Sequence, residues 1–118
     1  MILTAAEKNF ENRLKKFLED EGCWNVKFFA NAYTKSGIPD ILCCCNGWFL
    51  AIEVKAPNGK PSELQKWNIK KILESGGYAL ILYPDQYDDF KKFIHCLKDD
   101  RYGEAANIVG KINERWDK

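Results

Sequence analysis

Residues 37–55 read GIPDILCCCNGWFLAIEVK, two apolar segments joined by Asn46-Gly47. An Asn-Gly pair between apolar runs is the strongest short-range signal for a two-residue β-hairpin turn. Such a turn fixes the register of the two strands, and in that register Asp40 lies opposite Glu53, with Cβ atoms about 5 Å apart. The hairpin therefore predicts two carboxylates side by side at one end of a sheet.

Lys55 shares a face with Glu53, because side chains two residues apart on a strand point the same way. Two like charges about 5 Å apart repel by roughly 1 kcal/mol in water and roughly 3 kcal/mol at an effective dielectric constant of 20. A fold that keeps such a pair has a use for it, and the usual one is to bind a hard divalent cation such as Mg²⁺. A lysine beside that cation suits phosphodiester hydrolysis. The alternative is a surface hairpin with solvated charges.

The quoted residues Gly37-Ile38-Pro39-Asp40 and Glu53-Val54-Lys55, followed by Gln65, resemble the PD-(D/E)xK nuclease signature. More narrowly, the chain resembles the virus-type replication-repair nuclease family (VRR-NUC), of the small stand-alone phage type, as far as Tyr83. The resemblance implies an α/β fold with a restriction-endonuclease-like core in the order α-β-β-β-α-β. It also implies a DNA endonuclease that depends on Mg²⁺ or Mn²⁺ and cleaves branched DNA such as a four-way (Holliday) junction.

The resemblance also implies roles for the residues of the hairpin. Asp40 and Glu53 would bind the metal ion through their carboxylates, and the backbone carbonyl of Val54 would add a ligand. Lys55 would orient the attacking water and offset the charge that develops on the phosphorane. No covalent intermediate is required.

Two further polar residues come from the helices that flank this hairpin. Gln65 resembles the family's helix-borne glutamine that faces the site; alternatively, it is the capping-box partner of Ser62. The family places one more acid on the first helix. We assign this role to Glu11, because Glu7 is occupied as the capping partner of Thr4.

Lysines near the predicted site are the candidate contacts to DNA. Lys66 and Lys70 lie one helical turn apart and Lys60 precedes them, so they could form a basic strip; the alternative is a solvated helix face. Lys27, on the first predicted strand, would reach phosphate or remain solvated. The net charge of +1 adds little support, because a nucleic-acid binder is expected to carry a clustered basic face.

Capping signals and hydrophobic periodicity place the elements around the hairpin and predict a mixed sheet flanked by helices. We expect one domain over 1–118, with a core over about 4–97 and a C-terminal helical extension over about 104–116. In chain order the expected elements are a helix over 4–21, a strand over 24–28, a loop over 31–39, strands over 41–45 and 48–55, a helix from Ser62 to Gly76, a strand over 78–83, a helix with an apolar stripe at Phe90, Phe93, Ile94 and Leu97, and the last helix.

Composition bounds the class of protein. The chain has 118 residues, of which 46% are hydrophobic, enough for a single core. Five cysteines are an odd number, and three of them are adjacent on one strand, so we expect small core residues rather than a disulfide framework. The absence of a C-x-x-C pair argues against zinc. No stretch is apolar enough for a membrane span or a signal peptide, so we expect a cytoplasmic protein, in the host cytoplasm if a phage encodes it.

One site per chain and a symmetric junction together favour a C2 homodimer. The last helix, Trp24 or Trp67 could supply the interface; alternatively, the last helix closes the monomer's core. His95, among apolar residues of the third helix, is expected to be a packed core histidine. The alternative function is a non-catalytic nucleic-acid-binding or assembly module that retains the nuclease fold.

Overall fold

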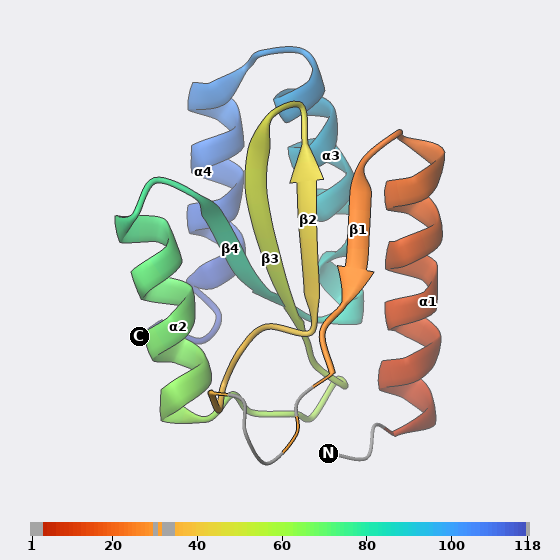
Figure 1. Cartoon of the computed structure of the whole chain (residues 1–118), viewed down its shortest axis with the longest axis vertical. Coiled ribbons are helices and arrows are strands. Elements are labelled where there is room, and N and C mark those ends of the chain that lie inside the picture. Colours follow the sequence, from red (N-terminus) through yellow and green to blue (C-terminus); the bar gives the residue numbers. More distant parts are fainter. Residues whose placement is uncertain (1–3, 30, 32–34, 118) are drawn as a thin grey trace.

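A four-stranded mixed sheet with helices on both faces forms the protein in the computed structural model (Figure 1). The structure describes residues 4–29, 31 and 35–117, so part of the predicted loop over 31–39 lies outside the described residues. The elements are α1 (Ala5–Asp20), β1 (Trp24–Lys27), β2 (Ile41–Cys45), β3 (Trp48–Val54), α2 (Glu63–Glu74), β4 (Tyr78–Leu82), the 3-10 turn η1 (Pro84–Gln86), α3 (Tyr87–Lys98) and α4 (Tyr102–Asn113).

The predicted hairpin register is confirmed. Asn46 and Gly47 have φ angles of 51° and 84°, the left-handed conformation that a two-residue hairpin turn requires at both positions. Cys45 pairs with Trp48 across the turn. In the sheet order β1-β2-β3-β4, the first three strands are antiparallel neighbours, and β4 runs parallel to β3 after the crossover through α2. The expected α-β-β-β-α-β order is therefore present.

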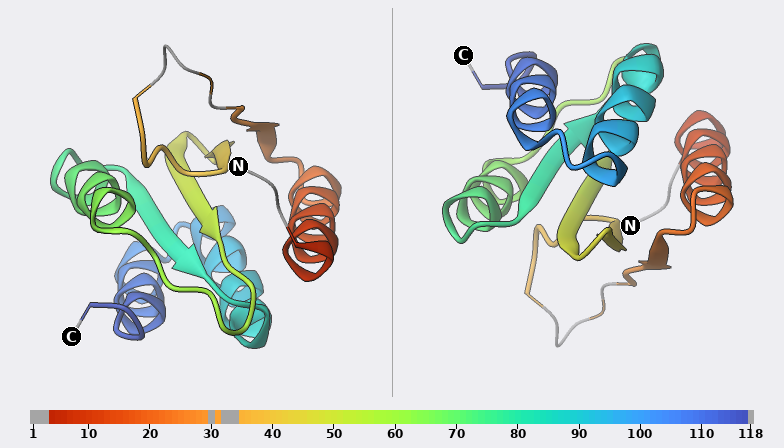
Figure 2. Two further views of the ribbon diagram at one scale, coloured as in Figure 1. Left: turned by 90° about the horizontal axis from the view of Figure 1, so that it is seen from below. Right: turned by 90° about the horizontal axis from the view of Figure 1, so that it is seen from above.

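The two faces of the sheet pack against different helices, as Figure 2 shows. Helices α1, α3 and α4 cover one face, where Leu14, Ile52 and Phe90 belong to the main core. Helix α2 covers the opposite face, where Ala51 and Ile69 belong to a smaller core. This arrangement leaves the outer surface of β1 and β2 without a helix over it, and Trp24 and Val26 are exposed there.

Helix α4 closes the free edge of β4. The Asn113 side chain acts in place of a further strand: its Nδ2 donates to the Ala79 carbonyl at 3.0 Å, and its Oδ1 accepts from the Ile81 N–H at 3.2 Å. Trp116 Nε1 donates to the same Oδ1 at 2.9 Å. An edge strand blocked in this way cannot pair with another chain. The apolar stripe of α4 thus closes the monomer's core, which was one of the two expected alternatives.

Two side chains qualify the expected core. Four of the cysteines are buried, but Cys44 is exposed. The expectation that His95 is a packed core histidine is wrong: its side chain is 52% exposed and its Nε2 lies 2.8 Å from Glu21 Oε1. The reason is helical phase, because His95 follows the buried Ile94 by one residue and so lies about 100° around α3 from it.

Among the residues that the structure describes, no helix combines the length and the apolar character needed to span a membrane.

Candidate active site

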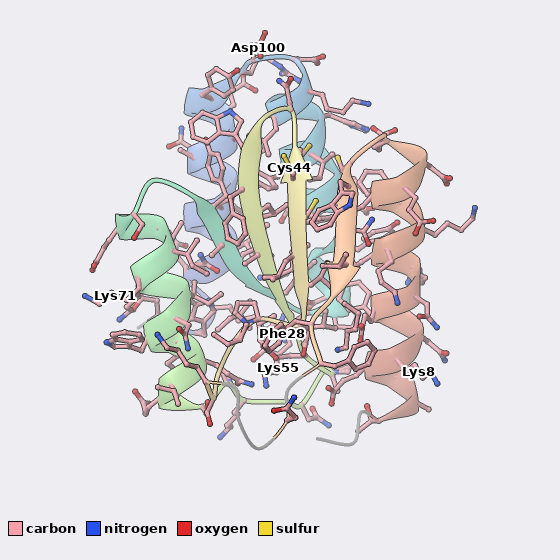
Figure 3. All side chains as sticks on the ribbon, in the orientation of Figure 1. Lys8, Phe28, Cys44, Lys55, Lys71 and Asp100 are labelled. Carbon is pink, nitrogen blue, oxygen red and sulfur yellow. The ribbon has the colours of Figure 1, made fainter. Side chains whose placement is uncertain are left out.

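Polar side chains gather at the end of the sheet where β1 ends, β2 begins and β3 ends. Figure 3 labels Lys55 at this end, near the N-terminal end of α2. The carboxyl end of a strand that feeds a crossover helix is a usual place for a ligand site in sheets with helices on both faces. Here it brings together side chains that are far apart in the chain.

Asp40 is held from two sides. Asp40 directly precedes Ile41, the first residue of β2 that pairs with β3. The Asp40 Oδ2 accepts a hydrogen bond from the Val54 N–H at 3.0 Å, and its Oδ1 lies 3.4 Å from Lys27 Nζ. Its backbone carbonyl accepts from the Phe28 N–H at 2.8 Å. The carboxylate is therefore fixed beside the end of β3.

Glu53 is a buried acid with one unused oxygen. Its Oε2 accepts from Gln65 Nε2 at 3.3 Å and lies 3.7 Å from Lys55 Nζ, whereas its Oε1 has no hydrogen-bond partner among the described residues. Burial raises the pKa of Glu53 to about 9, and the negative charge of the neighbouring Asp40 contributes to this shift. Without a cation, Glu53 is thus protonated near neutral pH.

Gln65 makes the contacts that both of its predicted roles require, one in the cap of α2 and one with Glu53. Its Oε1 accepts from the Ser62 N–H at 2.9 Å, which completes the capping box of α2. Its Nε2 is then directed at Glu53. The two roles are compatible because an amide side chain has an acceptor at one side and a donor at the other.

Lys27 links the first helix to the site. Its Nζ lies 3.2 Å from Glu11 Oε1 and 3.4 Å from Asp40 Oδ1, and its side chain is only 15% exposed. Lys27 is therefore not a solvated strand lysine, and its contact with phosphate stays a prediction. Two acids that packing brings together at this point need a counter-charge, and the ammonium provides it. Glu11, itself buried, reaches the cluster through this lysine.

The other three predicted DNA-contacting lysines lie outside this cluster. Lys66 pairs with Glu63 at 3.3 Å, and Lys70 pairs with Asp117 at 3.3 Å. Lys60 is exposed in the turn before α2. Their contact with DNA stays a prediction.

The donors fit a hard divalent cation, although they do not by themselves make a complete shell. Within residues 4–29, 31 and 35–117, no group of three Asp, Glu, His or Cys side chains is arranged to hold a metal ion. Asp40 and Glu53 are adjacent, and Glu53 Oε1 is an orphaned buried acceptor of the kind that a cation would satisfy. Mg²⁺ commonly takes one or two carboxylates and completes its shell with water and phosphate, so two acids suffice.

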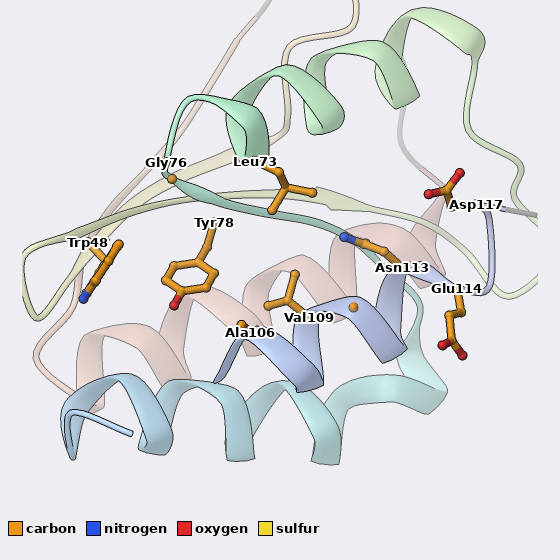
Figure 4. A pocket seen from close by; sticks show the side chains of 11 residues that line it. Trp48, Leu73, Gly76, Tyr78, Ala106, Val109, Asn113, Glu114 and Asp117 are labelled. Atoms are coloured by element: carbon orange, nitrogen blue, oxygen red, sulfur yellow. The ribbon is translucent and has the colours of Figure 1, made fainter. Parts of the chain in front are cut away.

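An apolar cavity elsewhere in the fold is separate from this cluster. It has a volume of about 430 Å³ and lies between α2, β4 and α4, with Leu73, Tyr78 and Val109 in its wall (Figure 4). None of the predicted catalytic residues lines it.

Comparison with known proteins assigns the class and then the family. A solved structure titled "VRR_NUC domain" has a TM-score of 0.64 and 23% sequence identity, over 75% of this chain and 97% of that chain. This likeness establishes the nuclease fold. A family model described as "Archaeal holliday junction resolvase (hjc)" matches residues 4–103. The chain therefore belongs to the archaeal Holliday junction resolvase family. No curated protein matches it.

Membership in this family confirms the expected PD-(D/E)xK nuclease. The protein is a metal-dependent DNA endonuclease that resolves Holliday junctions.

Proposed function

We propose that Asp40, Glu53, Lys55 and Gln65 form the catalytic site at which this protein cuts four-way junctions. One observation carries the assignment: the unpartnered, buried Oε1 of Glu53 lies in a cluster with Asp40 and the Lys55 ammonium at the end of β3. Orphaned buried acceptors are rare in folded proteins and call for a partner. Asp40, Glu53 and the Val54 carbonyl would hold Mg²⁺ or Mn²⁺, which polarises a phosphoryl oxygen and lowers the pKa of bound water.

The chain's own groups prepare the site for this chemistry. The Val54 N–H fixes the Asp40 carboxylate, and the Gln65 amide holds Glu53 Oε2 and so sets the direction of Oε1. The Lys55 backbone N–H donates to the Leu82 carbonyl at 3.0 Å, which ties the lysine to β4. From this fixed position its ammonium orients the attacking water and offsets negative charge that develops on the phosphorane.

The assignment is tested by incubating the protein with labelled four-way-junction, flap and linear DNA, in Mg²⁺, in Mn²⁺ or in EDTA. We expect cleavage only with metal and a preference for the junction over linear duplex. Binding should weaken steeply with salt, because contacts by Lys60, Lys66 and Lys70 would release counterions. Tight junction binding without cleavage under any metal condition would favour the alternative, a non-catalytic module that retains the fold.

We further propose that the protein acts as a C2 homodimer through the uncovered surface of β1 and β2. Trp24, Cys44 and Phe49 form a row on the same face of three neighbouring strands, because Cys44 pairs with both of the others. Trp24 is 64% exposed and Phe49 is 46% exposed. Resolving a four-way junction takes two cuts, in two strands that are related by symmetry. Each protein chain carries one site, so the paired cuts need two copies of the chain.

Light scattering checks this proposal. The wild type should be a dimer, and Trp24→Ser combined with Phe49→Ser should shift it to a monomer that has lost paired cutting. Trp67→Ser is the control, since Trp67 is an aromatic residue that is 54% exposed on α2 rather than on β1 or β3. A monomeric wild type that cuts junction and linear DNA equally would contradict the proposal.

Lys27 gives a prediction about metal affinity. Its ammonium already neutralises Glu11 and Asp40, so it competes with a metal ion for the same carboxylate. Lys27→Met should therefore bind Mn²⁺ more tightly than the wild type in calorimetry. In EDTA the same variant should lose about 3 kcal/mol of stability, because two acids are left without a counter-charge.

Lys66→Met is the control for this experiment, since Lys66 pairs with the exposed Glu63 outside the cluster. It should change neither quantity. Weaker Mn²⁺ binding by Lys27→Met would show instead that Lys27 holds the acids in their binding geometry.

A further inference from the structure

Three buried thiols lie together at the end of β2 opposite the nuclease site. Cys43 and Cys45 point to the same face of β2, and Cys23 precedes β1 beside them. The Sγ atoms of Cys23 and Cys45 are 2.9 Å apart, within hydrogen-bonding distance. Figure 3 shows the sulfur atoms gathered at this end of the strand, near the labelled Cys44. None of the three takes part in the proposed nuclease chemistry.

The backbone already has the geometry of a cross-strand disulfide. Trp24 pairs with Cys44 in the antiparallel ladder, so Cys23 lies directly opposite Cys45. The Cys23 N–H donates to the Leu18 carbonyl at 2.8 Å rather than to β2. The two cysteines are therefore a non-hydrogen-bonded pair, in which Cα atoms lie about 4.5 Å apart. That general separation falls within the range of roughly 4.4 to 6.8 Å found for disulfides.

A small cavity lies beside two of these cysteines. A cavity of about 220 Å³ is lined by both Cys23 and Cys45, and Lys98 stands in its wall. Hydrogen bonds with Cys43 and Cys45 lower the pKa of the Cys23 thiol, and the Lys98 ammonium lowers it further. The thiolate is the reactive form of cysteine, so Cys23 is the nucleophile that a small reagent in this cavity would meet.

We propose that Cys23 and Cys45 are a redox site that forms a reversible intramolecular disulfide when a peroxide enters this cavity. The Cys23 thiolate attacks one oxygen of hydrogen peroxide; an S–O bond forms, the O–O bond breaks, and the hydroxide released takes up a proton as water. The Cys45 sulfur then attacks the Cys23 sulfur, an S–S bond forms, and the second hydroxide leaves with the Cys45 proton as water. Two thiols lose two electrons and two protons, and one peroxide becomes two waters.

The bond would join the turn after α1 to the end of β2. It closes the chain segment from Cys23 to Cys45 and so restricts the unfolded state, which stabilises the folded protein. Helix α1 and β1 carry Glu11 and Lys27, so the same bond would hold these side chains to the sheet. The inference does not rest on the proposed nuclease function, because its chemistry and its location are separate.

The test uses the full chain, first reduced and then treated with hydrogen peroxide. We expect an intact mass lower by two hydrogens, a Cys23–Cys45 peptide pair in non-reducing digests, and a melting temperature higher by about 10 °C. Dithiothreitol should reverse all three. Cys23→Ser and Cys45→Ser should lose the bond. Cys44→Ser is the matched control and should keep it, since Cys44 neighbours Cys45 but is exposed on the other face.

The wild-type digest decides the question even if the core variants fail to fold. Five free thiols after treatment, or a bond from Cys23 to Cys43 in place of Cys45, would each overturn the proposal.

Discussion

Replacing Lys55 with alanine should reduce junction cleavage by about 10³-fold while leaving Mn²⁺ binding nearly unchanged. The Lys55 side chain is buried and its Nζ lies 3.7 Å from Glu53 Oε2, so under the proposed assignment its ammonium would lie beside the phosphate oxygen that gains charge. It is not a metal ligand, because an ammonium group has no lone pair to donate. Single-turnover cleavage and calorimetry with Mn²⁺ measure the two effects separately.

Two further variants serve as comparisons for Lys55→Ala. Lys60→Ala removes an exposed lysine five residues further on and should keep the single-turnover rate at saturating protein within a few fold of the wild type. Asp40→Ala should lose cleavage and metal binding together, since its carboxylate is a proposed ligand. Loss of Mn²⁺ binding in Lys55→Ala would refute the role given to the lysine. Cleavage by Asp40→Ala at the wild-type rate would place the site elsewhere.

The centre of the site could be predicted from one turn. Asn46 and Gly47 both accept the left-handed conformation, so the turn has two residues and the register of the flanking strands follows by counting. Asp40, Glu53 and Lys55 then fall at one end of the hairpin. The turn residues determine this part of the fold, because the strands of a hairpin are close together in the sequence.

Contacts between distant segments could not be predicted in the same way. Lys27 and Glu11 are separated by the end of α1 and the turn into β1, and only the packing of α1 against the sheet brings them together. The alternating pattern of β1 shows which face Lys27 occupies, but not which charges lie across from it. The sequence therefore left Lys27 as a solvated or DNA-contacting residue.

The last helix shows the same limit. Its apolar stripe was visible in the sequence, yet nothing in the stripe indicates that Asn113 replaces a strand at the edge of β4. That role depends on where α4 ends relative to Ala79 and Ile81. Helical phase explains the wrong prediction for His95. Neighbouring residues on a helix point in different directions, so His95 is exposed although the residue before it is buried.

The metal-free protein should lose stability as pH rises, and Glu53→Gln should remove much of that loss. Burial first, and then Asp40, raise the pKa of Glu53 to about 9 from the value of 4.5 that applies in the unfolded chain. Between these values the folded protein keeps a proton that the unfolded chain has released. The stabilisation is therefore complete below pH 4.5 and is lost as pH rises through about 9. This one group contributes at most about 1.4 kcal/mol per pH unit.

Glutamine has the shape of the protonated acid at every pH, so Glu53→Gln should match the wild type near pH 5 and exceed it at pH 8. Urea unfolding in EDTA over this range is the measurement. Glu7→Gln is the control, because Glu7 is a half-buried acid near the start of α1 that is hydrogen-bonded to Thr4, and its variant should follow the wild-type slope.

Mn²⁺ should reverse the order of the two proteins. It stabilises the wild type by binding the folded state, and this gain should grow with pH because ligation requires Glu53 to give up its proton. Glu53→Gln should gain little. The hairpin predicts repulsion between the two acids. Lys27 and the Val54 N–H already stabilise the Asp40 carboxylate, so the repulsion acts mainly against the ionised form of Glu53. A variant less stable than the wild type at pH 8 in EDTA would show that Glu53 is ionised there and supports the fold as the partner of Lys55.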